Sequence, residues 1–192
     1  MKKYVIAAGV PRAGKSTLCR MLAGELGYQH ISMDAVLAGI ETVFPETGID
    51  TEADLPPLEK FRQISAKAAP FLRAMMDSGE YDECGYGAVF DICQLMPEDC
   101  VRFFDPERCE IVYLLTSDVS PEERFAILKA HDTPLDYTYE NTDGENRQEC
   151  AELVEMSLAL RAECETCGVA FYETARNRPE ILRQIVSRIA DA

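Results

Sequence analysis

The chain has 192 residues, 47% of them hydrophobic, which predicts a single folded domain with a sizeable core and excludes a disordered chain. Its net charge of −15 argues against a nucleic-acid-binding surface, and no apolar run approaches the ~18 residues of a membrane span. We expect a cytoplasmic protein, in which the eight scattered cysteines are reduced core residues rather than a disulfide framework.

A strand-length apolar run at residues 4–8 leads into the phosphate-binding P-loop pattern G-x-x-x-x-G-K-[ST]. Residues 17–26 then carry the apolar stripe of a helix, so strand, loop and helix follow in the order that the motif requires. Loop N–H groups and the positive helix end would hold phosphate oxygens, with Lys15 reaching the β/γ-phosphates and Ser16 ligating Mg²⁺. The expected nucleotide-binding residues are Gly9, Val10, Pro11, Arg12, Ala13, Gly14, Lys15, Ser16 and Thr17.

A short strand is predicted at residues 29–32, followed by a helix at 35–40. Asp34 lies between them, at the carboxyl end of the strand, where ligands bind in open α/β sheets. It is a candidate general base for an acceptor hydroxyl, and the alternative is an N-cap for the helix. His30 lies within the strand and is expected to be a core residue.

The next segment is rich in helix. Residues 44–57 contain several Pro, Gly, Asp and Glu residues and predict a loop, and residues 58–76 carry a helical stripe that Pro70 should kink or split. Arg62 and Arg73 in this segment are candidate substrate-binding cations.

Strands are also predicted at residues 86–92 and 110–115. Asp91 in the first is a candidate carboxylate for Mg²⁺, with a turn residue as the alternative, and Asp118 after the second is its rival for that role. Motor and switch ATPases usually follow this Asp with a water-activating Glu. Ile92 stands there instead, which favours transfer to a bound acceptor over hydrolysis.

Ser120 begins a capping box with proline at the first helical position, and a helix is predicted from there to about residue 130. Arg124 on its first turns is a candidate for stabilising the transferring phosphoryl group, and a solvated surface arginine is the alternative. Lys129 and Arg147 are further candidates. His131 lies in a polar, irregular stretch and has no metal cluster with it.

The remaining elements are a long helix at residues 145–167, a strand at 169–172 and a final helix that opens at Pro179. Cys164 and Cys167 form a C-x-x-C pair, but they continue the apolar stripe of the long helix, which favours packing over a redox or zinc site. After the last strand, Thr174, Asn177 and Arg178 either border an adenine ring or form a loop and helix cap.

Alternating strands and helices predict an α/β fold with a parallel sheet. The layout resembles the nucleoside/nucleotide-kinase-like P-loop family, which includes adenylate, shikimate and gluconate kinases. The resemblance rests on Gly9 to Ser16, Ile31-Ser32-Met33-Asp34, Asp91, the helix start from Ser120 to Arg124, and Glu173-Thr174. It implies a three-layer α/β/α sandwich with a five-stranded parallel sheet of order 2-3-1-4-5, a helical acceptor-binding insertion at about 36–80 and a mobile lid at about 120–147. It also implies ATP and Mg²⁺.

These observations lead to the hypothesis of an ATP-dependent small-molecule kinase that uses Lys15, Asp34 and Arg124 in catalysis, with Ser16 and Asp91 for the metal. Two alternatives are kept. One is a nucleotide-binding regulatory protein with little transfer activity, because residues 125–146 carry no arginine, whereas lids of the family usually carry several. The other is a hydrolytic ATPase. The acceptor and the oligomeric state are left open.

Overall fold

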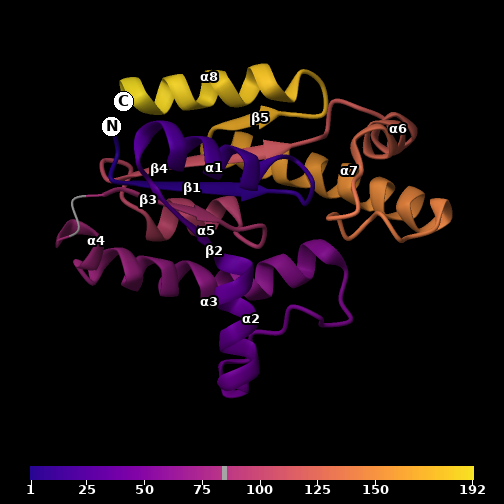
Figure 1. The fold of residues 1–192 in the computed structure, drawn as a ribbon. Coiled ribbons are helices and arrows are strands. Elements are labelled where there is room, and N and C mark those ends of the chain that lie inside the picture. Colours follow the sequence, from indigo (N-terminus) through magenta and orange to yellow (C-terminus); the bar gives the residue numbers. More distant parts are fainter. Residues whose placement is uncertain (84–85) are drawn as a thin grey trace.

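The computed structural model describes residues 1–83 and 86–192 and has a five-stranded sheet at its centre (Figure 1). The strands run in the order β2-β3-β1-β4-β5, and every neighbouring pair is parallel, which confirms the predicted fold class. The strands are β1 (Tyr4–Gly9), β2 (Gln29–Ser32), β3 (Ala88–Asp91), β4 (Cys109–Leu115) and β5 (Phe171–Glu173).

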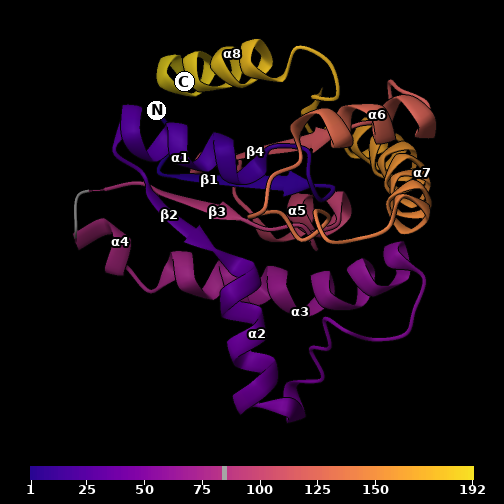
Figure 2. The same ribbon diagram turned by 45° about the vertical axis from the view of Figure 1, so that its right-hand side comes forward.

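Helices cover both faces of this sheet. The views in Figures 1 and 2 agree in showing α1 and α8 on one face and α3, α5 and α7 on the other. The helices are α1 (Lys15–Leu26), α2 (Met33–Val43), the 3₁₀ turn η1 (Pro45–Thr47), α3 (Pro57–Asp77), α4 (Glu80–Glu83), α5 (Pro97–Phe103), α6 (Pro121–His131), α7 (Asp143–Cys167) and α8 (Arg178–Asp191).

The core lies where the central strand is covered on both sides. All six residues of β1 are buried, as expected for a parallel strand between two helical layers. On α8, Leu182, Ile185, Val186 and Ile189 face the core, and burying each of these side chains contributes roughly 1.5–3 kcal/mol. This packing holds β1, β3 and β4 in place, so their carboxyl ends lie together at one end of the sheet.

Pro70 is the residue at which the sequence predicts a kink or a split in α3. The helix is not split, because α3 runs unbroken from Pro57 to Asp77. Proline removes the hydrogen bond to the carbonyl four residues earlier, here that of Ala66. Both Ala66 and Pro70 lie on the exposed side of α3, so water can satisfy that carbonyl.

Other boundaries shift by a few residues. Strand β3 is shorter than the predicted 86–92, β5 lies later than the predicted 169–172, and α2 is longer than the predicted 35–40. Short α4 was not anticipated by any pattern in the sequence. Within the described ranges, no helix combines the length and apolar character needed to cross a membrane.

The apolar stripe predicted on the long helix is confirmed, because Leu153, Met156, Leu160 and Cys164 are buried on α7. Cys167 is partly exposed at the end of the helix. Most of the other described cysteines are buried, as the sequence predicted, and Cys84 lies outside the described residues.

Candidate active site

The phosphate loop joins β1 to α1 through three residues with positive φ. These are Gly9 at 115°, Arg12 at 60° and Gly14 at 104°, and Gly14 is the N-cap of α1. Gly9 also packs tightly, since a Cβ built on it would lie 2.1 Å from the carbonyl oxygen of Leu114. Glycine is therefore required there for both its conformation and its size.

Replacing Gly9 by alanine is expected to destabilise the fold by about 2–5 kcal/mol, because positive φ costs ~1–2 kcal/mol and overpacking costs ~1–3 kcal/mol. Urea unfolding of the variant measures this loss. Gly24→Ala is the matched control, because Gly24 lies within α1 with open space around it, and alanine there should stabilise by ~0.5–1 kcal/mol. Equal stabilities of the two variants would contradict the prediction.

Lys15 begins α1 and is almost fully buried. Its Nζ donates to the carbonyl oxygen of Val10 at 2.8 Å, so the ammonium group lies over the loop. Ser16 and Thr17 follow on the first turn of α1 and are exposed to solvent. The loop therefore presents one ammonium group and two hydroxyl-bearing side chains at the positive end of a helix.

Two further arginines contact the loop backbone. Arg124 from α6 and Arg178 from α8 each donate to the carbonyl oxygen of Arg12, at 3.1 and 3.0 Å. Arg124 is 1% exposed, so the alternative of a solvated surface arginine is wrong. Burial, assisted by the charges of Arg178 and Arg12, lowers the pKa of Arg124 to about 10. Its Nε is buried and has no partner within the described part of the chain, so the guanidinium has an unused donor beside the loop.

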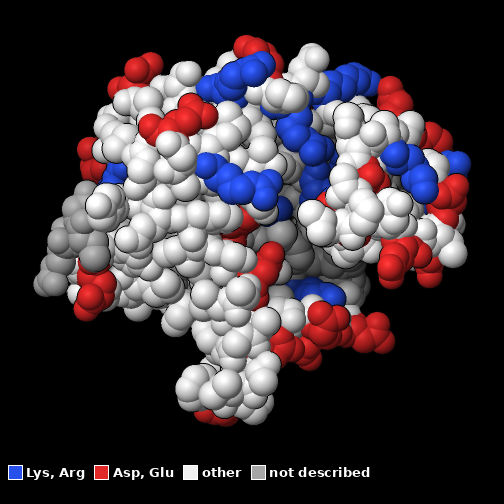
Figure 3. Space-filling view, in the orientation of Figure 1, with Lys and Arg blue, Asp and Glu red and all other residues white. Residues whose placement is uncertain are grey.

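Figure 3 shows basic side chains beside the hollow at this end of the sheet and acidic side chains below it. Arg178, a candidate for bordering an adenine ring, lies against the phosphate loop, where a Cβ on Gly14 would meet its Cδ at 3.0 Å. Thr174 is buried and donates to the carbonyl oxygen of Ala13 at 2.7 Å, so it supports the loop from β5. Asn177 is the N-cap residue of α8, but its side chain makes no capping hydrogen bond.

Arg12 pairs with an acidic segment, residues 132–142, between α6 and α7. Its guanidinium forms ion pairs with Asp132 at 3.0 Å and with Asp136. Asp132 also accepts a hydrogen bond from Thr138 at 2.6 Å, and the side chain of Asp132 is 6% exposed. The segment is therefore tied to the phosphate loop by its own carboxylates, which pair with Arg12 of the loop.

Arg12→Ala should loosen this segment without unfolding the protein. Removing one partner of a partly buried ion pair leaves Asp132 uncompensated, so we expect amide exchange at 136, 139 and 141 to accelerate at least about tenfold. Hydrogen exchange followed by mass spectrometry measures it. Arg176→Ala is the control, because Arg176 pairs with Glu123 on the exposed surface and its loss should leave those amides unchanged.

The carboxyl ends of β2 and β3 bring two carboxylates toward the loop. Asp34 lies in the first turn of α2, whose N-cap is Ser32, so the N-cap alternative for Asp34 is wrong. Burial raises the pKa of Asp34, and the nearby charge of Asp91 also raises it, while a hydrogen bond to Gln94 and the charge of Lys15 oppose them. A raised pKa is typical of carboxylates that act as bases.

Asp91 ends β3 and is 6% exposed. The Nε2 of His30 lies 3.4 Å from its Oδ2, with the His30 side chain 26% exposed, so the prediction of a core histidine is wrong. The ligand atoms of Cys19, His30 and Asp91 lie within 4.8 Å of one another. Asp118, the rival of Asp91, is exposed after β4, where its charge acts on Arg161.

No family model matches this sequence, and no curated protein sequence matches it. Solved structures match along the whole chain at low identity. Shikimate kinase from Acinetobacter baumannii matches with a TM-score of 0.58 at 16% identity, covering 100% of this chain and 92% of that one. A sugar kinase from Janibacter sp. HTCC2649 has a TM-score of 0.54 at 15% identity, covering 100% of this chain and 96% of that one. Dephospho-CoA kinase from Campylobacter jejuni has a TM-score of 0.51 at 13% identity, with the same coverage of 100% and 96%.

This chain has the P-loop kinase fold. The resemblance drawn from the sequence is thereby confirmed for the fold, and at these identities the likeness extends to the fold alone.

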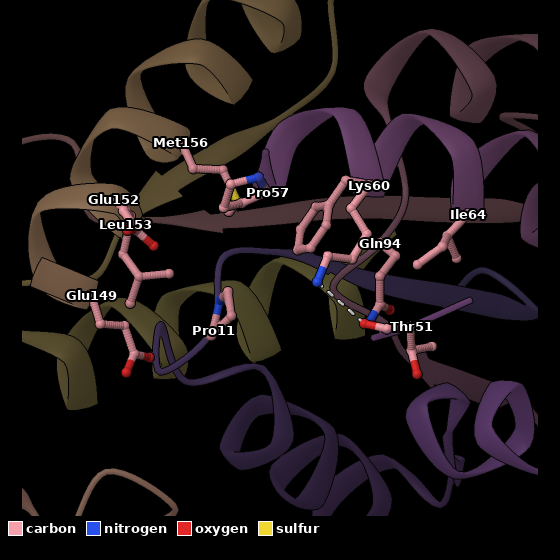
Figure 4. Close-up of a pocket in the computed structure, with 11 residues that line it drawn as sticks. Pro11, Thr51, Pro57, Lys60, Ile64, Gln94, Glu149, Glu152, Leu153 and Met156 are labelled. Atoms are coloured by element: carbon pink, nitrogen blue, oxygen red, sulfur yellow. Dashed lines mark hydrogen bonds between the residues drawn. The ribbon is translucent and has the colours of Figure 1, made fainter. Parts of the chain in front are cut away.

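The P-loop kinase fold leaves a cavity of about 190 Å³ beside the phosphate loop (Figure 4). Loop residue Pro11 lies on its wall, and α3 and α7 supply most of the rest. It is lined by Pro11, Thr51, Pro57, Lys60, Phe61, Ile64, Gln94, Glu149, Glu152, Leu153 and Met156. Lys60, Gln94 and Glu149 were not anticipated from the sequence, although Gln94 follows Asp91 by three residues and Lys60 shares the predicted helix of Arg62.

The two cations proposed for substrate binding do not line this cavity. Arg62 forms ion pairs with Glu98 and Glu163. Arg73 donates to the carbonyl oxygen of Phe103 at 3.0 Å and pairs with Asp77. Asp77 also pairs with Arg108, which precedes β4, so Arg73 lies toward the amino ends of the strands, away from the phosphate loop.

Lys129 and Arg147 also have other partners. Lys129 pairs with Asp143 at 3.1 Å, and the Arg147 guanidinium lies over the ring of Phe125 at 4.0 Å. Of the three cations proposed to close over the phosphates, only Arg124 therefore contacts the loop.

Proposed function

We propose that the protein is an ATP-dependent phosphotransferase that moves the γ-phosphate of Mg-ATP to a small-molecule acceptor. One observation carries the proposal: Asp34 links the phosphate loop to the cavity. Its carboxyl lies close enough to the side chain of Gln94 and to the ammonium of Lys15 for both to lower its pKa, and Gln94 lines the cavity with Pro11. A carboxylate in this position can accept the proton of an acceptor hydroxyl beside the phosphate site.

The residues around the loop fit a bound triphosphate. The unpartnered Nε of Arg124 and the ammonium of Lys15, which rests on a carbonyl of its own loop, are donors that an anion would satisfy. The loop's positive-φ residues allow its amides to converge on phosphate oxygens. We propose that Gly9 to Thr17 hold the phosphates and that Ser16 and Asp91 hold Mg²⁺.

Each side chain then has a defined role. Lys15 and Arg124 would neutralise charge that develops on the phosphoryl oxygens. Bound Mg²⁺ would supply further charge neutralisation between the phosphates. In the transfer, the acceptor oxygen bonds to the γ-phosphorus, the bond to the bridging oxygen breaks with its electron pair leaving on ADP, and the hydroxyl proton passes to Asp34.

The flanking segments take roles that follow from their contacts. We propose that residues 36–80 form the acceptor-binding region, because α3 supplies Pro57, Lys60, Phe61 and Ile64 to the cavity. We propose that 120–147 form a lid, because this range includes Arg124 and the segment that Arg12 holds.

The test is release of ADP from Mg-ATP across a panel of acceptors with a no-acceptor control. ADP that depends on one acceptor class supports the proposal. Equal release in every well, the control included, would support an ATPase instead. ATP binding without release in any well would favour the regulatory alternative, to which the acidic, Arg12-bound segment also lends support.

A further inference from the structure

Acceptor groups outnumber donors on the polar lining of the cavity. It includes the carboxylates of Glu149 and Glu152, the amide of Gln94 and one ammonium group, that of Lys60. Lys60 already donates to the carbonyl oxygen of Thr51 at 3.4 Å. Two carboxylates against one ammonium leave the lining with a net negative charge.

Among the residues that the structure describes, the two glutamates have only neutral hydrogen-bond partners. Glu149 accepts a hydrogen bond from the hydroxyl of Tyr137, and Glu152 accepts one from Nε2 of Gln148 at 3.0 Å. Over residues 1–83 and 86–192, no lysine, arginine or histidine lies within ion-pair distance of either carboxylate. In the view of Figure 4, both lie across the cavity from Lys60 and Gln94. Their negative charge is therefore available to a ligand.

Gln94 adds a second, independent sign of a missing donor. Its Oε1 is buried and has no hydrogen-bond partner among the described residues, while its side chain lies close enough to Asp34 to lower the pKa of that carboxyl. An unsatisfied buried acceptor costs roughly 1–3 kcal/mol, which a donor on a bound ligand would remove. The place for that donor is next to the proposed base.

We propose that the acceptor is a compact alcohol that carries a protonated amine, with its ammonium against Glu149 and Glu152 and its hydroxyl beside Gln94 and Asp34. This inference rests on the proposed function and names its substrate class. Phe61 and the other apolar walls would pack on the carbon skeleton. The volume of about 190 Å³ is below the ~300–1,000 Å³ of drug-sized pockets, so a nucleoside monophosphate fits neither the size nor the charge.

The experiment is calorimetric titration, without nucleotide, of amino alcohols, amino sugars and aminocyclitols, each beside its N-acetyl derivative and its carboxylate analogue. We expect an amine to bind at least about tenfold more tightly than its uncharged and anionic counterparts. Glu149→Gln, which keeps the acceptor for Tyr137, should weaken the amine about tenfold and leave the N-acetyl compound unchanged. Glu155→Gln is the control, because Glu155 is exposed on α7 outside the cavity.

Preference for neutral or anionic compounds, absence of binding by every amine, or equal loss of both ligands in Glu149→Gln would overturn the inference. The same panel with Mg-ATP separates this failure from that of the proposed function. ADP release with a neutral or anionic acceptor would support the proposed phosphotransferase function and contradict the inference that the acceptor carries an amine. Amine binding without ADP release would keep the amine site and reject the transfer.

Discussion

Lys15→Ala is expected to abolish phosphoryl transfer, with a fall in kcat/KM of at least about 10³-fold, while the fold persists. In the proposed function the ammonium neutralises the phosphates, and among the described residues no other lysine donates a hydrogen bond to the loop. Removing it leaves the carbonyl of Val10 without its donor, a loss of ~1 kcal/mol that a folded domain tolerates. Acceptor-dependent ADP release, with thermal unfolding alongside, measures both effects.

Lys129→Ala is the matched control. Lys129 is half exposed and pairs with Asp143 on the surface, so its loss should change neither turnover nor stability by much. Unchanged turnover in Lys15→Ala would reject the phosphate-loop assignment. A collapsed thermal transition would instead show that the lysine holds the loop together.

Asp34→Asn is expected to lower kcat by about 10²–10⁴-fold and to leave ATP affinity unchanged. Asparagine keeps the size of the side chain beside Gln94 but does not accept a proton. ATP binding by calorimetry and single-turnover transfer separate the two parameters. Asp54→Asn, at an exposed position outside the cavity, is the control and should behave as the unaltered protein. Normal transfer by Asp34→Asn would leave Asp34 only the role of a first-turn carboxylate at the positive end of α2.

The pH dependence of transfer gives a second readout for Asp34. A base is active when ionised, so its contribution is present above its pKa and is lost as the pH falls through it. Burial raises the pKa of Asp34 above its ordinary value of 3.8, so the acid limb of kcat should lie at a higher pH than for an ordinary aspartate. The limb should be absent from the residual activity of Asp34→Asn. A limb that persists there would assign it to another group.

Local patterns predicted the elements well because their physical causes lie within a few residues. The apolar run of β1, the capping box at Ser120 and the stripe of α7 each depend on neighbours along the chain, and all three are present. Predictions failed where tertiary surroundings decided the outcome. Pro70 lies inside an unbroken helix because its side of α3 faces solvent, and His30 is partly exposed because β2 is an edge strand.

The sequence by itself therefore determined the phosphate loop, the α/β fold class and the carboxylates at the strand ends. Each follows from contiguous residues or from the alternation of strands and helices along the chain. Only the tertiary structure decided which distant side chains meet. Arg124 and Arg178 reach the carbonyl of Arg12 across 112 and 166 residues, and the cavity joins α3 to α7. Such long-range contacts depend on how the helices pack over the sheet and on the paths of the connections between them. The spacing of residues along the chain predicts neither of these.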